Sequence, residues 1–203
     1  MCQMCVKTKR IDVAEVCLGN MRFARGAKAV REAKSETEVE AHLAMVALQL
    51  NMLDDAKKLY EECGRNDLLN EMLQAAGDWE EAVNIAEKND RINLKQTHYK
   101  MARHYETLGD FARAIEHYEA SDSFRTEVPR MLFACGRTNE LEKYIMGKDD
   151  KALFKWWANF LESKSDFSNA HMAYEKAGDF ASQVRLHCLQ GDFQAAEEVC
   201  TRT

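Results

Sequence analysis

The chain has 203 residues, of which 46% are hydrophobic and 31% are charged, with a formal net charge of −6. This composition is typical of a folded chain and excludes an intrinsically disordered one. No apolar run approaches the roughly 18 residues of a membrane-spanning helix. The residues after position 40 are acidic overall, which argues against helical repeats that bind RNA.

The first candidate site along the chain is a basic stretch. Between Lys7 and Lys34 there are eight basic residues and three acidic ones. Four of the basic residues recur at every third position: Arg22, Arg25, Lys28 and Arg31. This spacing spreads them over about half of a helix circumference. Such a basic face can bind an acidic partner or a lipid surface, but an ordinary solvated helix face is the favoured interpretation.

Seven cysteines are distributed along the chain: Cys2, Cys5, Cys17, Cys63, Cys135, Cys188 and Cys200. Cys2 and Cys5 have the spacing of a zinc-ligand pair, but no second pair of Cys or His follows them. The N-terminal residues do not have the pattern of a signal peptide. We therefore expect no metal site, and reduced, partly buried thiols in a cytoplasmic protein.

A pattern of Gly-Asp-aromatic-x-x-Ala recurs along the chain. Three full copies begin at Gly77-Asp78, Gly109-Asp110 and Gly191-Asp192. Weaker copies begin at Gly19, Asn51, Gly136 and Ser165. Successive copies start 26 to 32 residues apart, and a period of this length predicts a solenoid of stacked helical units.

Each copy has the features of a turn between two helices. Glycine suits the left-handed position that ends a helix, and the following Asp can accept hydrogen bonds from the amides that open the next one. Asp78 and Glu81 have the spacing of a capping box. The residues after the turn then follow an i, i+3, i+4, i+7 apolar stripe, as in Phe111, Ala114, Ile115 and Tyr118.

Small residues occupy a shared register before several turns. Ala44, Ala102 and Ala158 each lie seven residues before their turn, where they let two helices approach closely. Pro129 is expected in the first turn of a helix that begins near Glu127. Strand and hairpin signals are missing. The sequence therefore predicts an all-α, TPR-like solenoid of about seven helix–turn–helix repeats, with residues 1–203 forming a single segment.

We find no constellation of catalytic residues. The phosphate-loop, nucleophile-elbow and His-Glu-x-x-His motifs are absent from the sequence. The six histidines are His42, His98, His104, His117, His171 and His187. His98 and His104 would point about 120° apart on one helix, and His117 and His171 are interpreted as structural. We predict no catalytic residues and no cofactor; the alternative is a helical-array enzyme that uses the histidines and acidic side chains.

The largest aromatic concentration is the pair Trp156 and Trp157. Adjacent residues on a helix point about 100° apart, so one ring can face the core while the other lies at a repeat junction or on the surface. A surface tryptophan is a good candidate for contact with a partner protein.

Several segments resemble one family. The segment Cys5-Val-Lys-Thr-Lys-Arg10, with its continuation through residue 27, resembles the start of the helical half of the intraflagellar transport protein 140 family, a subunit of ciliary complex A. Ala75-Ala-Gly77, Glu127-Val-Pro-Arg-Met-Leu132 and Trp156-Trp-Ala158 are similar to the same family. Members carry WD-repeat propellers before this region and a longer solenoid after it, so the resemblance implies a fragment of a longer protein.

The resemblance also implies a function. We expect a non-enzymatic protein–protein interaction scaffold that acts in retrograde ciliary transport and brings membrane cargo into cilia. Its expected partners are other complex A subunits and membrane-cargo adaptors, at the ciliary base and along the axoneme. The alternatives are a coatomer-like vesicle coat subunit and a membrane-surface module that uses the basic face.

Overall fold

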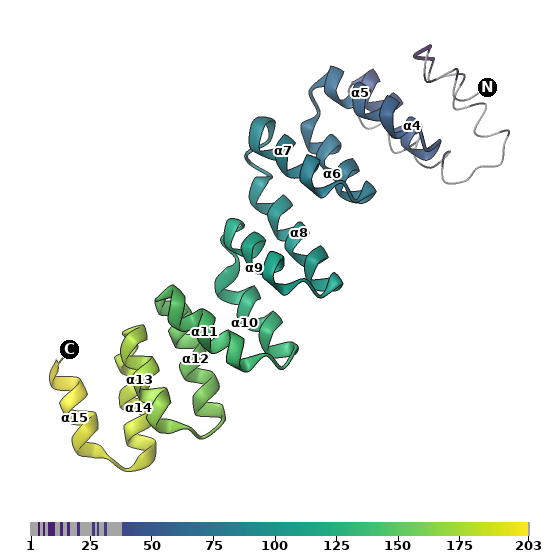
Figure 1. Cartoon of the computed structure of the whole chain (residues 1–203). Coiled ribbons are helices and arrows are strands. Elements are labelled where there is room, and N and C mark those ends of the chain that lie inside the picture. The colour runs from purple at the N-terminus through teal and green to yellow at the C-terminus, as the bar shows by residue number, and fades with distance from the viewer. Residues whose placement is uncertain are drawn as a thin grey trace. The chain divides into compact units, whose positions relative to one another are not determined.

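The computed structural model describes residues 38–202, together with residues 4, 6, 8–10, 13, 16, 20, 26, 28 and 31. Within residues 38–202 the regular structure is entirely α-helical (Figure 1). The helices of this range are α4 (Val39–Gln49), α5 (Leu53–Cys63), α6 (Asn66–Ala76), α7 (Trp79–Asn89), α8 (Leu94–Leu108), α9 (Phe111–Ala120), α10 (Phe124–Ala134), α11 (Thr138–Lys148), α12 (Lys151–Ser163), α13 (Phe167–Ala177), α14 (Phe180–Gln190) and α15 (Phe193–Arg202).

The helices are joined as hairpins whose turns have one backbone conformation. The left-handed residues of these turns are Asn51, Gly77, Gly109, Gly136, Ser165 and Gly191, with φ between 58° and 90°. Each of them follows the first helix of a pair, from α4–α5 through α14–α15. Gly19, which the sequence also assigns to a turn, lies outside the described residues. The chain is an all-α, TPR-like solenoid, which confirms the fold class predicted from the repeats.

Aspartate side chains cap most of the helices that follow a Gly-Asp or Ser-Asp turn. Asp110 accepts a hydrogen bond from the Arg113 amide at 3.3 Å, and Asp192 accepts one from the Ala195 amide at 3.1 Å. Asp78 makes no such bond, and the Glu81 carboxylate pairs instead with Lys57 on α5. The capping box predicted for residues 78–81 was therefore wrong.

The helix around Pro129 begins earlier than predicted. α10 starts at Phe124, because the amides of Thr126 and Glu127 already donate to the Ser123 carbonyl, at 3.2 and 3.1 Å. Pro129 is thus a buried residue inside the helix. The missing proline N–H removes only the donor that would face the carbonyl of Arg125, one turn earlier.

The contacts divide the chain into two compact units, Met1–Met101 and Ala102–Thr203. In the first unit, α4 to α7 enclose a core that includes Leu43, Val46, Tyr60 and Leu73. In the second unit, the largest fully buried side chains include Tyr118, Leu132, Ile145, Leu153 and Tyr174. Each core is thus built from the apolar stripes of neighbouring helices.

The small residues that lie seven positions before a turn are buried, on the first helix of their hairpin. Ala44, Ala102 and Ala158 are each 0% exposed, as expected for residues at a close helix contact. In α6 the corresponding residue, seven positions before Gly77, is Asn70, which is 2% exposed. This substitution of an amide for a methyl group introduces a buried polar network, described below.

Candidate partner-binding surface

The basic face predicted near the N-terminus lies only in part within the described residues. Lys28 and Arg31 are helical and exposed. Arg22 and Arg25 lie outside the described residues. The basic face therefore stays a prediction.

The two adjacent tryptophans have different surroundings. Trp157 is 6% exposed and belongs to the core of the second unit. Trp156 is half-buried and stacks on Phe160, with 5.9 Å between the ring centroids. Phe133 on α10 meets both rings edge-on, at 6.2 Å from Trp156 and 5.6 Å from Phe160. We refer to Phe133, Trp156 and Phe160 as the aromatic cluster.

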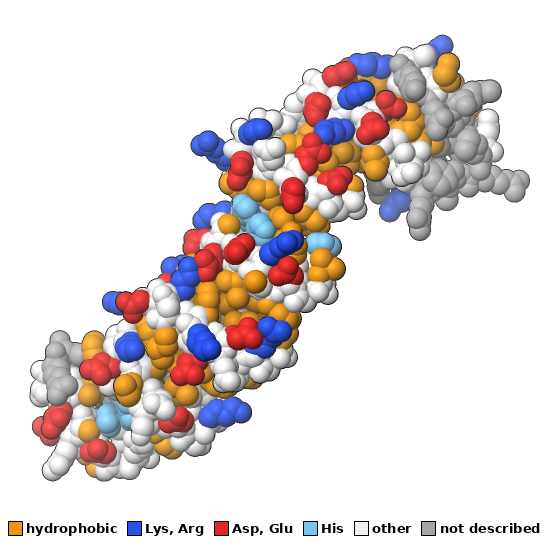
Figure 2. Space-filling view, viewed as in Figure 1, with side chains coloured by type: hydrophobic (Ala, Val, Ile, Leu, Met, Phe, Trp, Pro, Cys, Tyr) orange, Lys and Arg blue, Asp and Glu red, His pale blue; other side chains and the backbone are white. Residues whose placement is uncertain are grey.

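The aromatic cluster is one of several places where large apolar side chains reach the solvent. Phe133 is 50% exposed, Met172 is 60% exposed and Phe193 is 70% exposed. Figure 2 shows hydrophobic side chains at the surface, interspersed with acidic and basic ones, along the described helices. Among these exposed residues, Phe133 stands out because its ring contacts two further rings from the next hairpin. Such contacts hold an apolar surface in a fixed shape.

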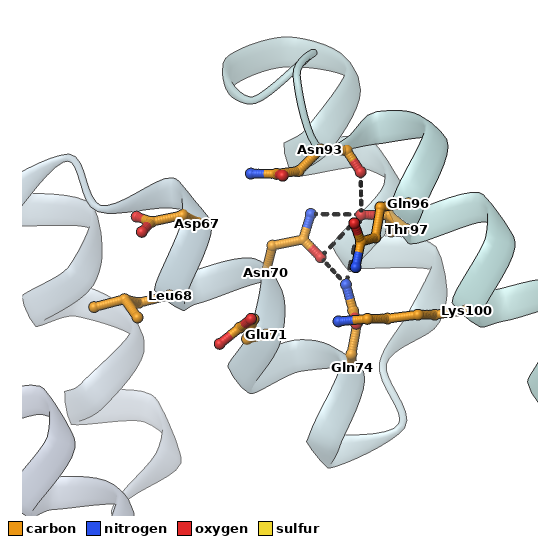
Figure 3. Close-up of a pocket in the computed structure, with 9 residues that line it drawn as sticks. All are labelled: Asp67, Leu68, Asn70, Glu71, Gln74, Asn93, Gln96, Thr97 and Lys100. Atoms are coloured by element: carbon orange, nitrogen blue, oxygen red, sulfur yellow. Dashed lines mark hydrogen bonds between the residues drawn. The ribbon is translucent and has the colours of Figure 1, made fainter. Parts of the chain in front are cut away.

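A polar pocket of about 220 Å³ lies between α6 and α8 in the first unit (Figure 3). At its base, the Asn70 amide donates to the Thr97 hydroxyl at 3.1 Å and to the Ala82 carbonyl at 3.3 Å. The Asn70 side-chain oxygen accepts from Gln74. No buried side-chain nitrogen or oxygen of this pocket lacks a hydrogen-bond partner. We therefore interpret the Asn70 network as a structural link between the two helices.

A second groove, of about 330 Å³, runs along α11, α12 and α13 in the second unit. Met146 and Met172 line it and are 46% and 60% exposed. Lys176 lies at this groove, with its Nζ atom 3.9 Å from the Met146 sulfur and 5.2 Å from the centre of the Phe154 ring. The groove also contains Glu142 and Asp166, so its charges are of both signs.

Two sets of Arg, Glu and Tyr side chains tie successive hairpins together in the second unit. In the first, Glu106 accepts hydrogen bonds from the Tyr118 hydroxyl at 2.6 Å and from Arg130 at 2.8 Å. In the second, Glu162 accepts from Tyr174 at 2.7 Å and from Arg185 at 2.8 and 2.6 Å. In both, the Glu and Tyr belong to one hairpin and the Arg to the next. We call them the 106 clamp and the 162 clamp.

The clamps perturb the titration of their members. The hydrogen bonds from Arg185 and Tyr174 hold the pKa of Glu162 below its ordinary value. Burial and the bond to Glu162 raise the pKa of Tyr174 to about 12. At Glu106, burial acts to raise the pKa, but the bonds from Arg130 and Tyr118 outweigh it and the pKa is lowered. Both carboxylates therefore stay ionised at neutral pH.

Sequence reasoning missed the clamps, although a signal was present. Glu106 and Glu162 are 56 positions apart, as are Tyr118 and Tyr174. Both glutamates lie three residues before a turn, and Arg130 and Arg185 lie six residues before the next one. Comparing side chains at equal distances from the turns would have revealed the clamps.

The histidines take part in ring contacts. His117 stacks on Tyr105 with 5.5 Å between ring centroids. His171 and His187 stack at 3.8 Å, and their Nδ1 atoms are buried without a hydrogen-bond partner. Across the described residues, no three His, Cys, Asp or Glu side chains are grouped so that they could hold a metal ion.

The cysteines are more exposed than predicted. Of the four thiols that the structure describes, Cys63 is half-buried, whereas Cys135, Cys188 and Cys200 are exposed. The exposed thiols lie at or near helix C-termini, where the apolar stripe ends. Cys2 and Cys5, the pair with zinc-ligand spacing, lie outside the described residues. Among the helices that could be searched, none combines the length and the apolar character needed to cross a membrane.

Stacked helical hairpins with exposed aromatic and charged side chains define a helical-repeat domain of the tetratricopeptide type, a fold that is typically non-catalytic. A family model for the TPR domain of intraflagellar transport proteins 140 and 172 matches residues 1–203. The chain therefore belongs to this TPR domain family. This membership confirms the resemblance noted in the sequence and makes the chain a helical-repeat scaffold of the intraflagellar transport type. It implies interaction with other intraflagellar transport proteins and an association with cilia.

Proposed function

We propose that the chain is a non-enzymatic scaffold within intraflagellar transport complex A. In this role it acts in retrograde ciliary transport and helps to bring membrane cargo into cilia. One observation carries the proposal: the family model extends over the whole sequence, residues 1–203. The hairpin array is a second support, since repeats of this kind typically offer extended surfaces to partner proteins.

The proposed mechanism is the positioning of partners. Buried side chains, such as those of Ala102 and Ala158, belong to the packing that fixes the helices. The exposed side chains of those helices are then held in place for partners, which include other complex A subunits and membrane-cargo adaptors. We place the chain in the cytoplasm, at the ciliary base and along the axoneme. Residues 1–203 are taken as a single solenoid segment of a longer protein.

Affinity capture from ciliated cells tests this function. The tagged protein is expressed in these cells, and the proteins that copurify are quantified by mass spectrometry. Enrichment of complex A subunits is the expected result. Recovery of vesicle coat subunits in their place would overturn the proposal and assign the chain to vesicle traffic.

The basic face offers a second contact for the same scaffold. Lys28 and Arg31, its described members, are exposed. We expect salt-sensitive binding to an acidic partner or to anionic vesicles, because charges at the surface are screened by salt. Replacing Lys28 and Arg31 by Glu should abolish that binding; unchanged binding would show that the face is only solvated.

A further inference from the structure

The aromatic cluster combines rings from two successive hairpins. Phe133 comes from α10, and Trp156 and Phe160 come from α12. The three rings contact one another at 5.6 to 6.2 Å between centroids, and half of Phe133 is exposed. Clustered aromatic side chains at a surface are frequent anchors of protein–protein contacts, since they bury a large area and lose little conformational entropy.

Basic residues flank the aromatic cluster along its own helices. Residues three and four positions apart share a face of a helix. We therefore compared the residues three and four positions away from each ring, on α10, on α12 and in the turns that follow them. These positions hold three basic residues and no acidic one. The cations are Arg130, Arg137 and Lys164. Arg130 and Arg137 each pair with a glutamate, so the positive charge that remains at the cluster is that of Lys164.

The three basic residues differ in whether they already form an ion pair with a carboxylate. Arg130 pairs with Glu106 and Glu127, at 2.8 and 2.7 Å, and Arg137 pairs with Glu140 at 3.1 Å. Lys164 is exposed, and its ammonium lies 5.8 Å from the centre of the Phe160 ring. Within the described part of the chain, no ion pair of Lys164 with a carboxylate is found. Lys164 therefore leaves an uncompensated positive charge at the edge of an apolar surface.

We propose that the aromatic cluster and Lys164 together bind an acidic segment of a partner protein. The segment places an apolar side chain against Phe133, Trp156 and Phe160 and a carboxylate at Lys164. This inference rests on the proposed scaffold function and specifies the chemistry of one partner. A nucleic acid is disfavoured, because Arg130 and Arg137 are already paired and only one cation remains for a phosphate backbone.

Site-specific photo-crosslinking tests the proposal in the full-length protein. The photoreactive amino acid p-benzoylphenylalanine replaces Ser163, which is exposed and lies one turn from Phe160. The protein is expressed in ciliated cells and irradiated, and the crosslinked peptide is sequenced by mass spectrometry. We expect a peptide of net negative charge that contains an apolar residue.

Three variants complete the test. Trp156→Ala should reduce the crosslink yield by about tenfold, the effect of removing an interface anchor. Lys164→Glu should reduce it by about threefold or more while leaving the rings intact, through like-charge repulsion. Phe193→Ala serves as the matched control, since it removes an exposed aromatic residue from outside the cluster and should leave the yield unchanged.

The possible outcomes separate this inference from the proposed function. Crosslinks to a basic or neutral segment, to a nucleic acid or to a second copy of this chain would overturn it. So would the absence of a crosslink, or a yield that neither Trp156→Ala nor Lys164→Glu lowers. Complex A subunits are quantified in the same purification. If they copurify while the crosslink fails, the docking site is refuted and the scaffold function stands.

Discussion

Arg185 on α14 donates hydrogen bonds to both carboxylate oxygens of Glu162 on α12, at 2.8 and 2.6 Å. The two residues belong to successive hairpins, and the same carboxylate accepts the hydroxyl of the buried Tyr174. The Glu162 side chain is 22% exposed, whereas Arg185 is 49% exposed. The carboxylate thus joins a buried phenol to a largely solvated guanidinium, and the ion pair alone should contribute little stability.

Glu162→Ala should therefore destabilise the protein mainly by removing the charged one of the two acceptors of the Tyr174 hydroxyl, the other being the Asn159 side-chain oxygen at 2.7 Å. We expect the free energy of unfolding to fall by about 1–2 kcal/mol, the usual cost of removing a partly buried, charge-assisted hydrogen bond. Urea denaturation followed by circular dichroism measures it. Glu142→Ala, at an exposed glutamate on α11, is the control and should change stability by less than about 0.5 kcal/mol. Equal effects of the two variants would refute a role for the 162 clamp.

Ala158→Arg should break the packing of the second unit. Ala158 is 0% exposed, so the larger charged side chain would overfill its site and lose its hydration. We expect a loss of about 3 kcal/mol or more, and the same at Ala102, by thermal or urea unfolding. Ala112→Arg on α9, at an exposed alanine, is the matched control. Full stability of the Ala102 and Ala158 variants would show that the small-residue register is wrong.

Substitutions at two turns should change the stability of the protein in opposite directions. Ser165 has a φ of 61° and Gly109 a φ of 78°, both in the left-handed region. Ser165→Gly should stabilise the protein by about 0.5–1 kcal/mol, and Gly109→Ala should destabilise it by about 1 kcal/mol, because a Cβ is disfavoured there. A Cβ at Gly109 would meet no atom within 4 Å, so the cost comes from the backbone alone. Melting temperatures that move in the same direction would contradict this prediction.

The Asn70 network predicts non-additive mutations. Asn70→Ala introduces the alanine that α4, α8 and α12 carry at this register, but leaves the Thr97 hydroxyl and the Ala82 carbonyl without the Asn70 amide. We expect a loss of about 1–3 kcal/mol for this single change. Asn70→Ala with Thr97→Val removes both members of one bond, so it should cost less than the two single changes summed. A double-mutant cycle by urea denaturation measures the coupling, and strict additivity would argue against the network.

Stability should fall on mild acidification because of His187. Burial and the neighbouring His171 ring lower the pKa of His187 from its ordinary value of 6.5. The folded state therefore binds fewer protons than the unfolded state just below pH 6.5. The contribution to stability is present above the unfolded-state pKa and is lost as the pH falls through the folded-state pKa.

Melting temperatures between pH 7.5 and pH 5 measure this effect. His187→Gln should reduce the pH dependence without removing it, because burial also lowers the pKa of His98. His104→Gln, in another hairpin, should have a smaller effect. If His104→Gln reduced the pH dependence more than His187→Gln, the stacked pair of His171 and His187 would be excluded as its source.

The fold could be predicted because its signals are local. A residue such as Gly109 ends a helix through its own backbone preference, and Asp110 caps the next helix through a bond to Arg113. Neither event needs information about distant residues. The predicted capping box failed because of a distant residue: Glu81 pairs with Lys57 of another hairpin.

The candidate surface was harder to predict because it depends on contacts between hairpins. Trp156 was singled out by its size, and Phe160 stacks on it from the same helix, but Phe133 joins them only when α10 packs beside α12. Likewise, the stack of His171 on His187 requires the register of α13 against α14. A pattern within one repeat does not fix that register.

The two clamps occur in alternate hairpins, and this has a mechanical consequence. The 106 clamp links the hairpin of α8 and α9 to α10, and the 162 clamp links the hairpin of α12 and α13 to α14. At the registers where a third clamp would lie, α10 and α12 carry Phe133 and Asn159. At that junction, the contacts of the Phe133 ring with Trp156 and Phe160 and the ion pair of Arg125 with Asp150 join the two hairpins instead. Under load, ring packing therefore resists separation at the middle junction, whereas charge-assisted hydrogen bonds resist it at the two junctions on either side.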